Sequence, residues 1–306
     1  MANIQRVKTI SEFHRNRKLI EPAHPLISVI DYADVKLSAE DYNKSWVLDF
    51  YFISLKKHVG GKIKYGQQEY DFDEGVMFFI APGQVYSIGI TPDVSPDKSG
   101  WMMLIHPDFF WNTSLAKNIK TYDYFDYSIH EALFLSKKEE ITMWGIIENI
   151  KQEYQANIDK FSQNIIISQI ETLLNYSERF YNRQFITRKK AAHKILNRLE
   201  DVLTDYFTSD NLIAKGLPTV HYIAQTLNVS PKYLSSLLKV LTGQNTQQHI
   251  HEKLIEKAKE KLSVTDLSVS EIAYELGFEH SQSFSKLFKS KTSLSPLAFR
   301  QSFTSN

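Results

Sequence analysis

The 306-residue sequence contains no cysteine, so it can form neither disulfide bonds nor thiolate metal sites, and this fits a reducing cytoplasm. No apolar run approaches the roughly 20 residues that a membrane-spanning helix needs, and the N-terminus lacks the apolar core of a signal peptide. Neither a P-loop nor the nucleophile elbow of α/β-hydrolases occurs. We therefore predict no membrane segment and no catalytic residues.

The chain also has little excess charge, with a formal net charge of +1 at pH 7. From Lys190 onward it holds 14 Lys and Arg against 11 Asp and Glu, while the preceding part holds 22 against 24. This asymmetry is small. Any affinity for nucleic acid must therefore come from individually placed lysines rather than from a general positive field, and it should weaken with salt.

The stretch from Pro218 to Phe303 contains one short pattern twice. Ile223, Ala224 and Leu227 recur 49 residues later as Ile272, Ala273 and Leu276. A second set recurs 50 residues later: Leu234 as Phe284, Ser235 as Ser285, Lys239 as Lys289 and Thr242 as Thr292. One residue is therefore inserted in the turn of the second copy. A repeat this close predicts one structural unit used twice.

Each copy has the start and stop signals of two short helices around a tight turn. Ser268 and Glu271 form a capping-box pattern, and Gly277 is placed to end the helix that follows. Ser230 followed by Pro231 predicts the start of the second helix in the first copy. Each copy is therefore predicted to be a helix-turn-helix.

The outward faces of the two second helices carry polar side chains that suit a DNA major groove. Hydroxyls, an amide and lysines can contact base edges and phosphates there, and Gln282 is the best candidate for direct readout because an amide pairs both ways with adenine. The alternative is an ordinary solvated helix face, which two related faces in a duplicated unit disfavour. The predicted DNA-binding residues are Lys232, Tyr233, Ser235, Ser236 and Lys239, then His280, Ser281, Gln282, Ser283, Ser285, Lys286 and Lys289.

Short motifs across this stretch carry a family resemblance. They are Ile272-Ala273, Gly277-Phe278, Phe284-Ser285, Phe288-Lys289, Ser295-Pro296, Phe299-Arg300 and Leu241-Thr242-Gly243, with the helix from Ile250 to Leu262. On these residues the last third of the chain resembles the DNA-binding domain of AraC/XylS transcription regulators. The resemblance implies two helix-turn-helix units, joined by a long helix, that enter successive major grooves. It also implies that Lys232, Ser235, Ser236, Gln282, Ser283 and Lys286 contact bases.

Three positions depart from the family pattern. Ser283 stands where many members have an aromatic or larger residue, Lys286 replaces a frequent arginine, and Ser293 replaces a usual glycine. Lysine lacks the rigid fork with which arginine pairs with guanine, so the base sequence that the second reading helix prefers cannot be copied from relatives.

The first 107 residues have the pattern of short strands, which predicts an antiparallel barrel or sandwich. The predicted strands are Leu26–Tyr32, Trp46–Leu55, Lys62–Tyr65, Glu69–Phe72, Val76–Ile80, Val85–Ile90 and Gly100–Ile105. Gly75 to Tyr86 resembles the second half of a cupin barrel signature, and AraC-type regulators often carry such a barrel as their effector domain. The two resemblances support each other.

The barrel is predicted to hold no metal and no other cofactor. His24, His58 and His106 are scattered and form no His-x-His pair. A barrel without metal can hold a small-molecule effector among inward aromatic residues, or those residues simply fill the core. The candidate effector-binding residues are Trp46, Phe50, Phe52, Tyr86, Trp101 and Met103.

Two amphipathic helices follow the barrel. Ser136 and Glu139 form a capping-box pattern that opens a helix through Ile150, and a second helix is expected over Ser162–Tyr181. These helices can cover the barrel or pair with a second subunit, and the resemblance favours a homodimer. The predicted division is 1–184 for effector sensing and dimerisation, 185–190 as a linker, and 191–306 for DNA binding.

The sequence thus predicts an α+β chain with a cupin-like antiparallel β-barrel and flanking helices, followed by an all-α domain of two helix-turn-helix units joined by a long helix. The predicted function is a cytoplasmic, sequence-specific transcription regulator, an activator on resemblance, whose partners are double-stranded DNA, a small-molecule effector and RNA polymerase. One alternative is a metal-dependent cupin enzyme fused to a DNA-binding tail. Another is a structural nucleic-acid binder without sequence preference, which would bind all duplexes equally.

Overall fold

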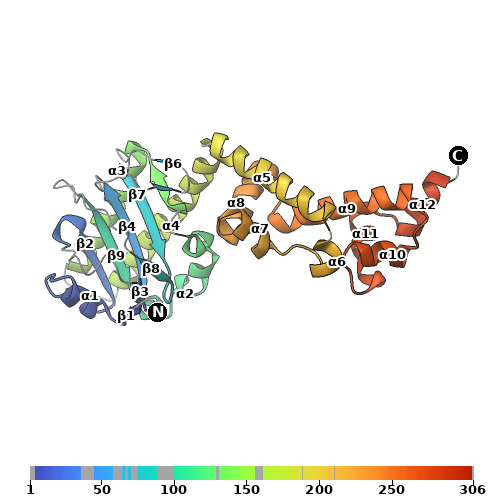
Figure 1. Cartoon of the computed structure of the whole chain (residues 1–306). Coiled ribbons are helices and arrows are strands. Elements are labelled where there is room, and N and C mark those ends of the chain that lie inside the picture. The colour runs from blue at the N-terminus through green and yellow to red at the C-terminus, as the bar shows by residue number, and fades with distance from the viewer. Residues whose placement is uncertain are drawn as a thin grey trace. The chain divides into compact units, whose positions relative to one another are not determined.

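The computed structural model describes residues 4–35, 45–57, 64–65, 68–69, 75–87, 99–128, 131–155, 161–187, 189–209 and 211–304. The chain divides into two compact units, Met1–Gln184 and Phe185–Asn306, here called the N-terminal and C-terminal units. Figure 1 shows strands and helices in the first and helices in the second. Both parts of the predicted fold class, a β-rich unit with flanking helices and an all-α unit, are confirmed.

The larger sheet of the N-terminal unit has five antiparallel strands in the order β10-β7-β4-β9-β2 (Figure 1). Their bounds are β2 Ile27–Asp31, β4 Tyr51–Lys57, β7 Gly75–Ile80, β9 Ser99–Ile105 and β10 Leu133–Leu135. Aromatic and β-branched residues dominate these strands, as the pleated and buried surface of a sheet favours. β10 was not among the predicted strands.

A smaller sheet has the order β1-β3-β8, with β1 Ile4–Val7, β3 Ser45–Leu48 and β8 Val85–Ser87. β3 and β8 are antiparallel, whereas β1 runs parallel to β3, a pairing that the sequence did not suggest. The predicted single strand Trp46–Leu55 is divided at Asp49 and Phe50 into β3 and β4. The short pair β5 Lys64–Tyr65 and β6 Gln68–Glu69 is antiparallel, as predicted, although the remainder of both expected strands lies outside the described residues.

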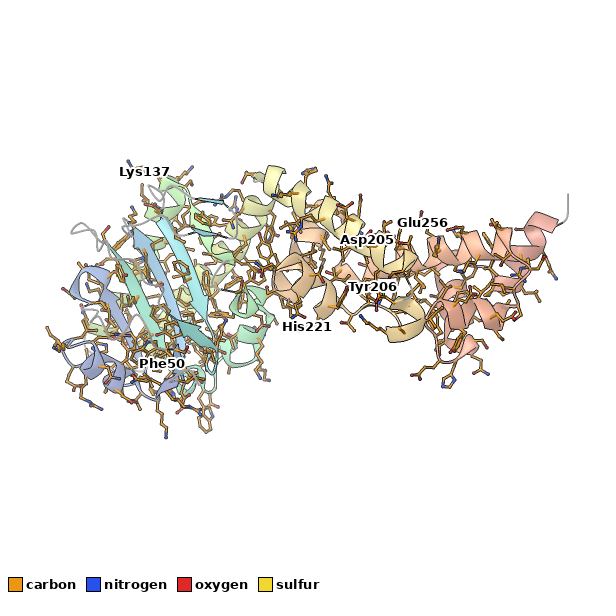
Figure 2. All side chains as sticks on the ribbon, viewed as in Figure 1. Phe50, Lys137, Asp205, Tyr206, His221 and Glu256 are labelled. Atoms are coloured by element: carbon orange, nitrogen blue, oxygen red, sulfur yellow. The ribbon has the colours of Figure 1, made fainter. Side chains whose placement is uncertain are left out.

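The core between these two sheets follows the alternation of side chains along each strand. Phe52 of β4, Met102 and Leu104 of β9, and Ile80 of β7 face one way and pack in one cluster with Trp46 and Leu48 of β3. Phe50, labelled in Figure 2, is fully buried in the same cluster. We call this cluster the inter-sheet core.

A short helix that the sequence analysis did not identify, α1 Ile10–Asn16, closes part of the inter-sheet core. Thr9 caps it, because its side chain accepts a hydrogen bond from the Glu12 backbone at 3.1 Å. Ile10 and Phe13 of α1 are buried in the core. The Thr-x-x-Glu pattern that begins α1 is a capping-box signal.

Helices α3 Lys137–Gln155 and α4 Ser162–Thr187 are attached to the strands of the larger sheet. Tyr154 of α3 exchanges hydrogen bonds with the backbone of Val29 in β2. Gln184 of α4 accepts from the Phe134 backbone in β10 at 2.8 Å. The predicted capping box at Ser136 is confirmed, with the Ser136 N–H donating to Glu139 at 2.8 Å. The remaining elements of the unit are α2 Leu115–Asn118 and 3-10 turns at Tyr32–Asp34, Pro107–Phe110, Ile119–Thr121 and Asp123–Asp126.

α4 continues beyond its predicted end at Tyr181 to Thr187, and the next helix begins at Lys189. The described part of the predicted 185–190 linker is therefore helical. It contains neither proline nor glycine, the two residues that most strongly interrupt helices.

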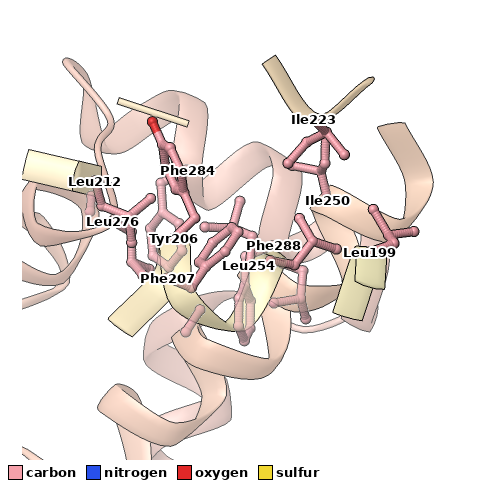
Figure 3. Close-up of a cluster of buried hydrophobic side chains, with 14 of the residues drawn as sticks. Leu199, Tyr206, Phe207, Leu212, Ile223, Ile250, Leu254, Leu276, Phe284 and Phe288 are labelled. Atoms are coloured by element: carbon pink, nitrogen blue, oxygen red, sulfur yellow. The ribbon is translucent and has the colours of Figure 1, made fainter. Parts of the chain in front are cut away.

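The C-terminal unit is built from helices around one hydrophobic core, which Figure 3 shows in part. Tyr206 and Phe207 lie in this core together with Leu254, Phe284 and Phe288. Since one cluster includes residues from both copies of the repeat, the two copies share a core. The helices are α5 Lys189–Thr208, α6 Asn211–Lys215, α7 Val220–Leu227, α8 Pro231–Thr242, α9 Thr246–Val264, α10 Val269–Glu275, α11 Ser281–Thr292 and α12 Pro296–Thr304.

Candidate nucleic-acid interface

The two copies of the repeat have the same turn geometry. Asn228 ends α7 with a φ of 59°, and Gly277 follows α10 with a φ of +80°, so both adopt the left-handed conformation. The next backbone N–H donates to the oxygen of Ala224 in the first copy and of Ala273 in the second, at 3.0 Å in each. Each copy is therefore a helix-turn-helix, with α7 and α8 in the first and α10 and α11 in the second.

The second helix of each pair, α8 or α11, is called a reading helix here, and the two begin differently. Ser230 caps α8 by accepting from the Tyr233 backbone at 3.2 Å, with Pro231 at the first helical position as predicted. At α11 the N-cap residue His280 makes no capping hydrogen bond through its side chain. The first-turn amides of a helix favour anions, and those of α11 lack this competing side-chain acceptor.

Buried residues hold each reading helix at helical spacing. Leu234, Leu237 and Leu238 of α8 are buried, as are Phe284 and Phe288 of α11. Phe284 packs 5.5 Å from the ring of Phe278 in the preceding turn. This anchoring leaves the opposite face of each helix outside the core.

On α8 the predicted DNA-binding residues differ in what they contact. Lys232 and Lys239 are exposed, and Ser236 is partly exposed. The Ser235 hydroxyl lies 3.0 Å from the hydroxyl of Thr246, the first residue of α9, so at least one of its hydrogen bonds is internal. The ring of Tyr233 lies 5.2 Å from the ring of Phe185 within the C-terminal unit.

The predicted residues of α11 form a more open face. His280, Gln282, Ser283, Lys286 and Lys289 are all exposed, and Ser281 and Ser285 are partly exposed. Gln282, Lys286 and Lys289 follow the i, i+4, i+7 spacing of a single helix face. Ser285 is the equivalent of Ser235, but the position equivalent to Thr246 is Pro296, which offers no hydroxyl.

The reading helices carry an unbalanced charge. α8 and α11 contain lysines and no acidic residue, and α11 has three of them. On α9, by contrast, Lys253 lies 3.1 Å from Glu256, and Lys257 lies 2.7 Å from Glu260. The positive charge of the unit is therefore least compensated on the reading helices, which suits contact with phosphates.

Histidines of the connecting helix α9 add little to that charge at neutral pH. Burial lowers the pKa of His249, and burial with the nearby Lys291 lowers the pKa of His251. Both imidazoles are therefore mostly neutral at pH 7. His249 instead shares a hydrogen bond of 2.9 Å with the Thr242 hydroxyl at the end of α8.

Contacts between elements fix the second helix-turn-helix. Lys261 of α9 pairs with Glu275 of α10 at 2.6 Å. Arg300 of α12 donates to the backbone oxygen of Leu262 at 3.2 Å and of Leu267 at 2.6 Å, which ties α12 to the α9–α10 connection. The sequence showed Arg300 only as a family match and gave no sign of these partners.

A close backbone contact joins the second turn to the segment before the first helix-turn-helix. A Cβ atom placed on Gly277 would lie 2.7 Å from the Leu212 oxygen and 2.9 Å from the Gly216 Cα. Tyr206 also donates to the oxygen of Gly216 at 2.9 Å. Gly277 was predicted as a helix end, and its second role as a contact with α6 was missed because Leu212 is 65 residues earlier in the sequence.

Ser293, which departs from the family pattern, adopts the left-handed conformation after α11 with a φ of 65°. Gly243 occupies the equivalent position after α8 with a φ of +79°. The turn therefore keeps the glycine-like geometry, with a serine at a position that glycine occupies more easily.

The six candidate effector residues do not line one space. Trp46, Phe50, Phe52 and Tyr86 belong to or pack against the inter-sheet core. Trp101 and Met103 are buried on the opposite face of β9, because they alternate with Met102 and Leu104, which face the inter-sheet core. Only the first four can therefore contact a ligand between the two sheets.

Two searches of the described residues returned nothing. No helix there is long and apolar enough to cross a membrane. Over the same part of the chain, no three histidine or acidic side chains come together as metal ligands would.

Comparison with known proteins concentrates on the C-terminal unit. The family described as "Helix-turn-helix domain" matches residues 223–302. The uncharacterized HTH-type transcriptional regulator YijO of Escherichia coli (strain K12) is 33% identical over 107 residues, which are 35% of this chain and 37% of that protein. The HTH-type transcriptional activator RhaS of Enterobacter sp. (strain 638) is 34% identical over 106 residues, 35% of this chain and 36% of that protein.

Among solved structures, the C-terminal domain of AraT, a response regulator from Geobacillus stearothermophilus, is 30% identical, with a TM-score of 0.31. The match covers 35% of this chain and 84% of that one. The chain spans just over a third of the length of YijO and of RhaS, and the relatives are transcriptional regulators. Its C-terminal unit therefore belongs to the helix-turn-helix DNA-binding domains of the AraC/XylS family.

Proposed function

We propose that this protein is a sequence-specific DNA-binding transcription regulator that reads two successive major-groove segments with α8 and α11. The observation that carries the proposal is the pair of helix-turn-helix units on one shared core, each with a polar face free of acidic residues. α9 has 19 residues, which corresponds to a rod of about 28 Å. With part of each flanking unit, this length suits the roughly 34 Å between successive major grooves.

In this proposal Gln282, Ser283 and Lys286 contact base edges, while Lys239 and Lys289 contact phosphates. Gln282 is exposed at the first turn of α11, where the reading helix of a helix-turn-helix meets the bases. Lys232 and Ser236 have the corresponding role on α8. Ser235 is assigned a mainly structural role there, because its hydroxyl already bonds to Thr246.

The N-terminal unit would control this activity by binding a small molecule between its two sheets. A ligand shifts the populations of two arrangements only if it binds them with different affinity. The relative RhaS is named an activator, which favours activation, and an activator acts through RNA polymerase. These steps place the protein in the cytoplasm with the chromosome.

A homodimer formed through α3 and α4 is part of the same proposal. Ile141 of α3 is 69% exposed, and Ile165 of α4 is 44% exposed. Large apolar side chains at these exposures would be covered by a second subunit. Sedimentation of the unsubstituted protein and of Ile141→Glu would test this, and a monomer at micromolar concentration would contradict it.

The decisive test is DNA binding by the full chain across salt concentrations, against fragments of the source genome and a shuffled duplex. Gln282→Ala is expected to weaken a preferred site by about 1–3 kcal/mol or to relax selectivity at one base pair. Gln225→Ala is the matched control, because Gln225 is an exposed amide on α7, outside the reading helices. Equal affinity for every duplex, unchanged by Gln282→Ala, would instead support a structural nucleic-acid binder.

The enzyme alternative has its own measurement. A metal-dependent cupin enzyme would purify with stoichiometric iron or manganese, which elemental analysis detects. Stoichiometric metal together with unspecific DNA binding would replace the regulator with that enzyme.

A further inference from the structure

The inter-sheet core contains an unusual polar row on β4. Phe52, Ser54 and Lys56 alternate with Ile53 and Leu55, so they point to the same face of the sheet. Phe52 belongs to the inter-sheet core, which places Ser54 and Lys56 on that face too. Residues two apart on a strand are about 6.6 Å apart. A hydroxyl and an ammonium thus adjoin the aromatic residues between the sheets.

Lys56 is a cation held among aromatic rings. Its ammonium lies 5.1 Å from the centre of the Tyr32 ring and 5.4 Å from that of Phe78. Burial, with a smaller contribution from the positive charge of Arg17, lowers the pKa of Lys56 to about 8. Within the described residues no carboxylate forms an ion pair with Lys56. The neighbour opposite it on β9 is Gly100, which has no side chain.

Arg17 brings a second positive charge to the same core. It follows α1 and is only 3% exposed. Its guanidinium lies 4.7 Å from the centre of the Trp46 ring and 5.8 Å from that of Phe13. Since its charge acts on the pKa of Lys56, the two cations lie within electrostatic reach of each other. Two like charges so close in a low-dielectric core destabilise the unliganded protein.

Two buried donors in this core have no hydrogen-bond partner among the described residues. They are the Ser54 hydroxyl, on a residue that is 0% exposed, and the Trp46 indole N–H, on a residue that is 4% exposed. A buried polar group without a partner costs about 1–3 kcal/mol, and native structures rarely leave such groups unsatisfied. Both are donors, as are the two cations, so one acceptor-rich ligand would satisfy all four.

We infer that Arg17, Trp46, Ser54 and Lys56 form a binding site for the carboxylate of a small organic acid, whose apolar body packs against Phe52 and Tyr86. The rings of Phe52 and Tyr86 are stacked with centres 6.4 Å apart, which provides an apolar wall. Lys56 keeps part of its surface exposed, so the site communicates with solvent. The inference rests on the proposed control of DNA binding by a small molecule and names the chemical class of that molecule.

The test compares acids with neutral molecules of the same shape. Benzoate and hexanoate serve as probes, with benzamide and hexanamide as their uncharged counterparts. Thermal unfolding is followed by tryptophan fluorescence, because Trp46, Trp101, Trp111 and Trp144 all lie in the N-terminal unit. At least one acid should raise the unfolding temperature more than its amide and change the fluorescence on titration.

Variants then separate this site from general charge effects. Lys56→Met and Arg17→Met should weaken binding of that acid about tenfold or more, because each removes a charge-assisted hydrogen bond. Arg15→Met is the matched control on α1, since Arg15 is 64% exposed at its side chain, and it should bind like the unsubstituted protein. Without ligand, Lys56→Met should unfold at a higher temperature than the unsubstituted protein, which a purely structural lysine would not do.

The inference is overturned if neither acid acts differently from its amide, or if Lys56→Met and Arg17→Met bind the acid as Arg15→Met does. DNA binding is measured on the same preparations. Specific DNA binding without acid binding would reject this inference and leave the proposed function standing. Acid binding together with unspecific DNA binding would reject the regulator and keep the site.

Discussion

Replacing Gly277 by alanine tests whether the second helix-turn-helix is held against α6. Gly277 has a φ of +80°, a conformation that costs a residue with a Cβ about 1–2 kcal/mol. The new Cβ would also lie 2.7 Å from the Leu212 oxygen and 2.9 Å from the Gly216 Cα. Both are backbone atoms that cannot turn away as a flexible side chain would. Overpacking of this kind costs a further 1–3 kcal/mol, roughly.

We therefore expect Gly277→Ala to lower the free energy of unfolding of the C-terminal unit by about 2–5 kcal/mol. Gly243→Ala is the matched control. Gly243 has nearly the same φ, +79°, but no atom lies within 4 Å of its added Cβ. It should lose only the conformational part, about 1–2 kcal/mol. The difference between the two variants isolates the contact with α6.

Urea unfolding followed by far-UV circular dichroism reports the helices, while tryptophan fluorescence reports the N-terminal unit alone. The fluorescence midpoint should be the same in both variants and the unsubstituted protein. If Gly277→Ala loses no more stability than Gly243→Ala, the close approach between the second turn and α6 is refuted.

Three further predictions concern single side chains. Ser235→Ala removes the hydrogen bond to Thr246 and should cost about 1 kcal/mol of stability, with equal weakening on all DNA sequences; loss of selectivity at one base pair in a binding-site selection would show direct readout instead. Lys286→Gln should reduce the slope of log K against log salt by about 1 if Lys286 contacts phosphate, and an unchanged slope with altered base preference would assign it to a base. Lys56 should make the N-terminal unit more stable as pH rises from 8 to 10.5, since its pKa is about 8 when folded and 10.5 when unfolded. That gain, on the order of 3 kcal/mol, should be missing in a fluorescence-monitored pH series of Lys56→Met.

Local signals in the sequence predicted the helix-turn-helix units well. The capping box at Ser268, the cap at Ser230 and the helix end at Gly277 are all confirmed. Each depends on residues within four positions of one another, so the necessary physics is contained in a short segment. The Thr9 cap of α1 and the Asn245 capping box of α9 have the same kind of signal and were overlooked.

The N-terminal unit was predicted less completely because its interactions are not local. The sequence showed one strand where β3 and β4 are separate, and it did not indicate that β1 pairs in parallel with β3. Which face of β9 meets the inter-sheet core depends on strand register, and this decided that Trp101 and Met103 lie apart from Trp46.

The sequence by itself determined the repeat, the caps and the polar faces of α8 and α11, because helical periodicity and end signals act over a few residues. Only the tertiary structure decided which side chains meet across long separations. It paired Ser235 with Thr246, brought Gly277 against Gly216, and enclosed Arg17 and Lys56 in one core. These contacts arise from packing between elements, where burial and charge depend on neighbours that no local pattern identifies.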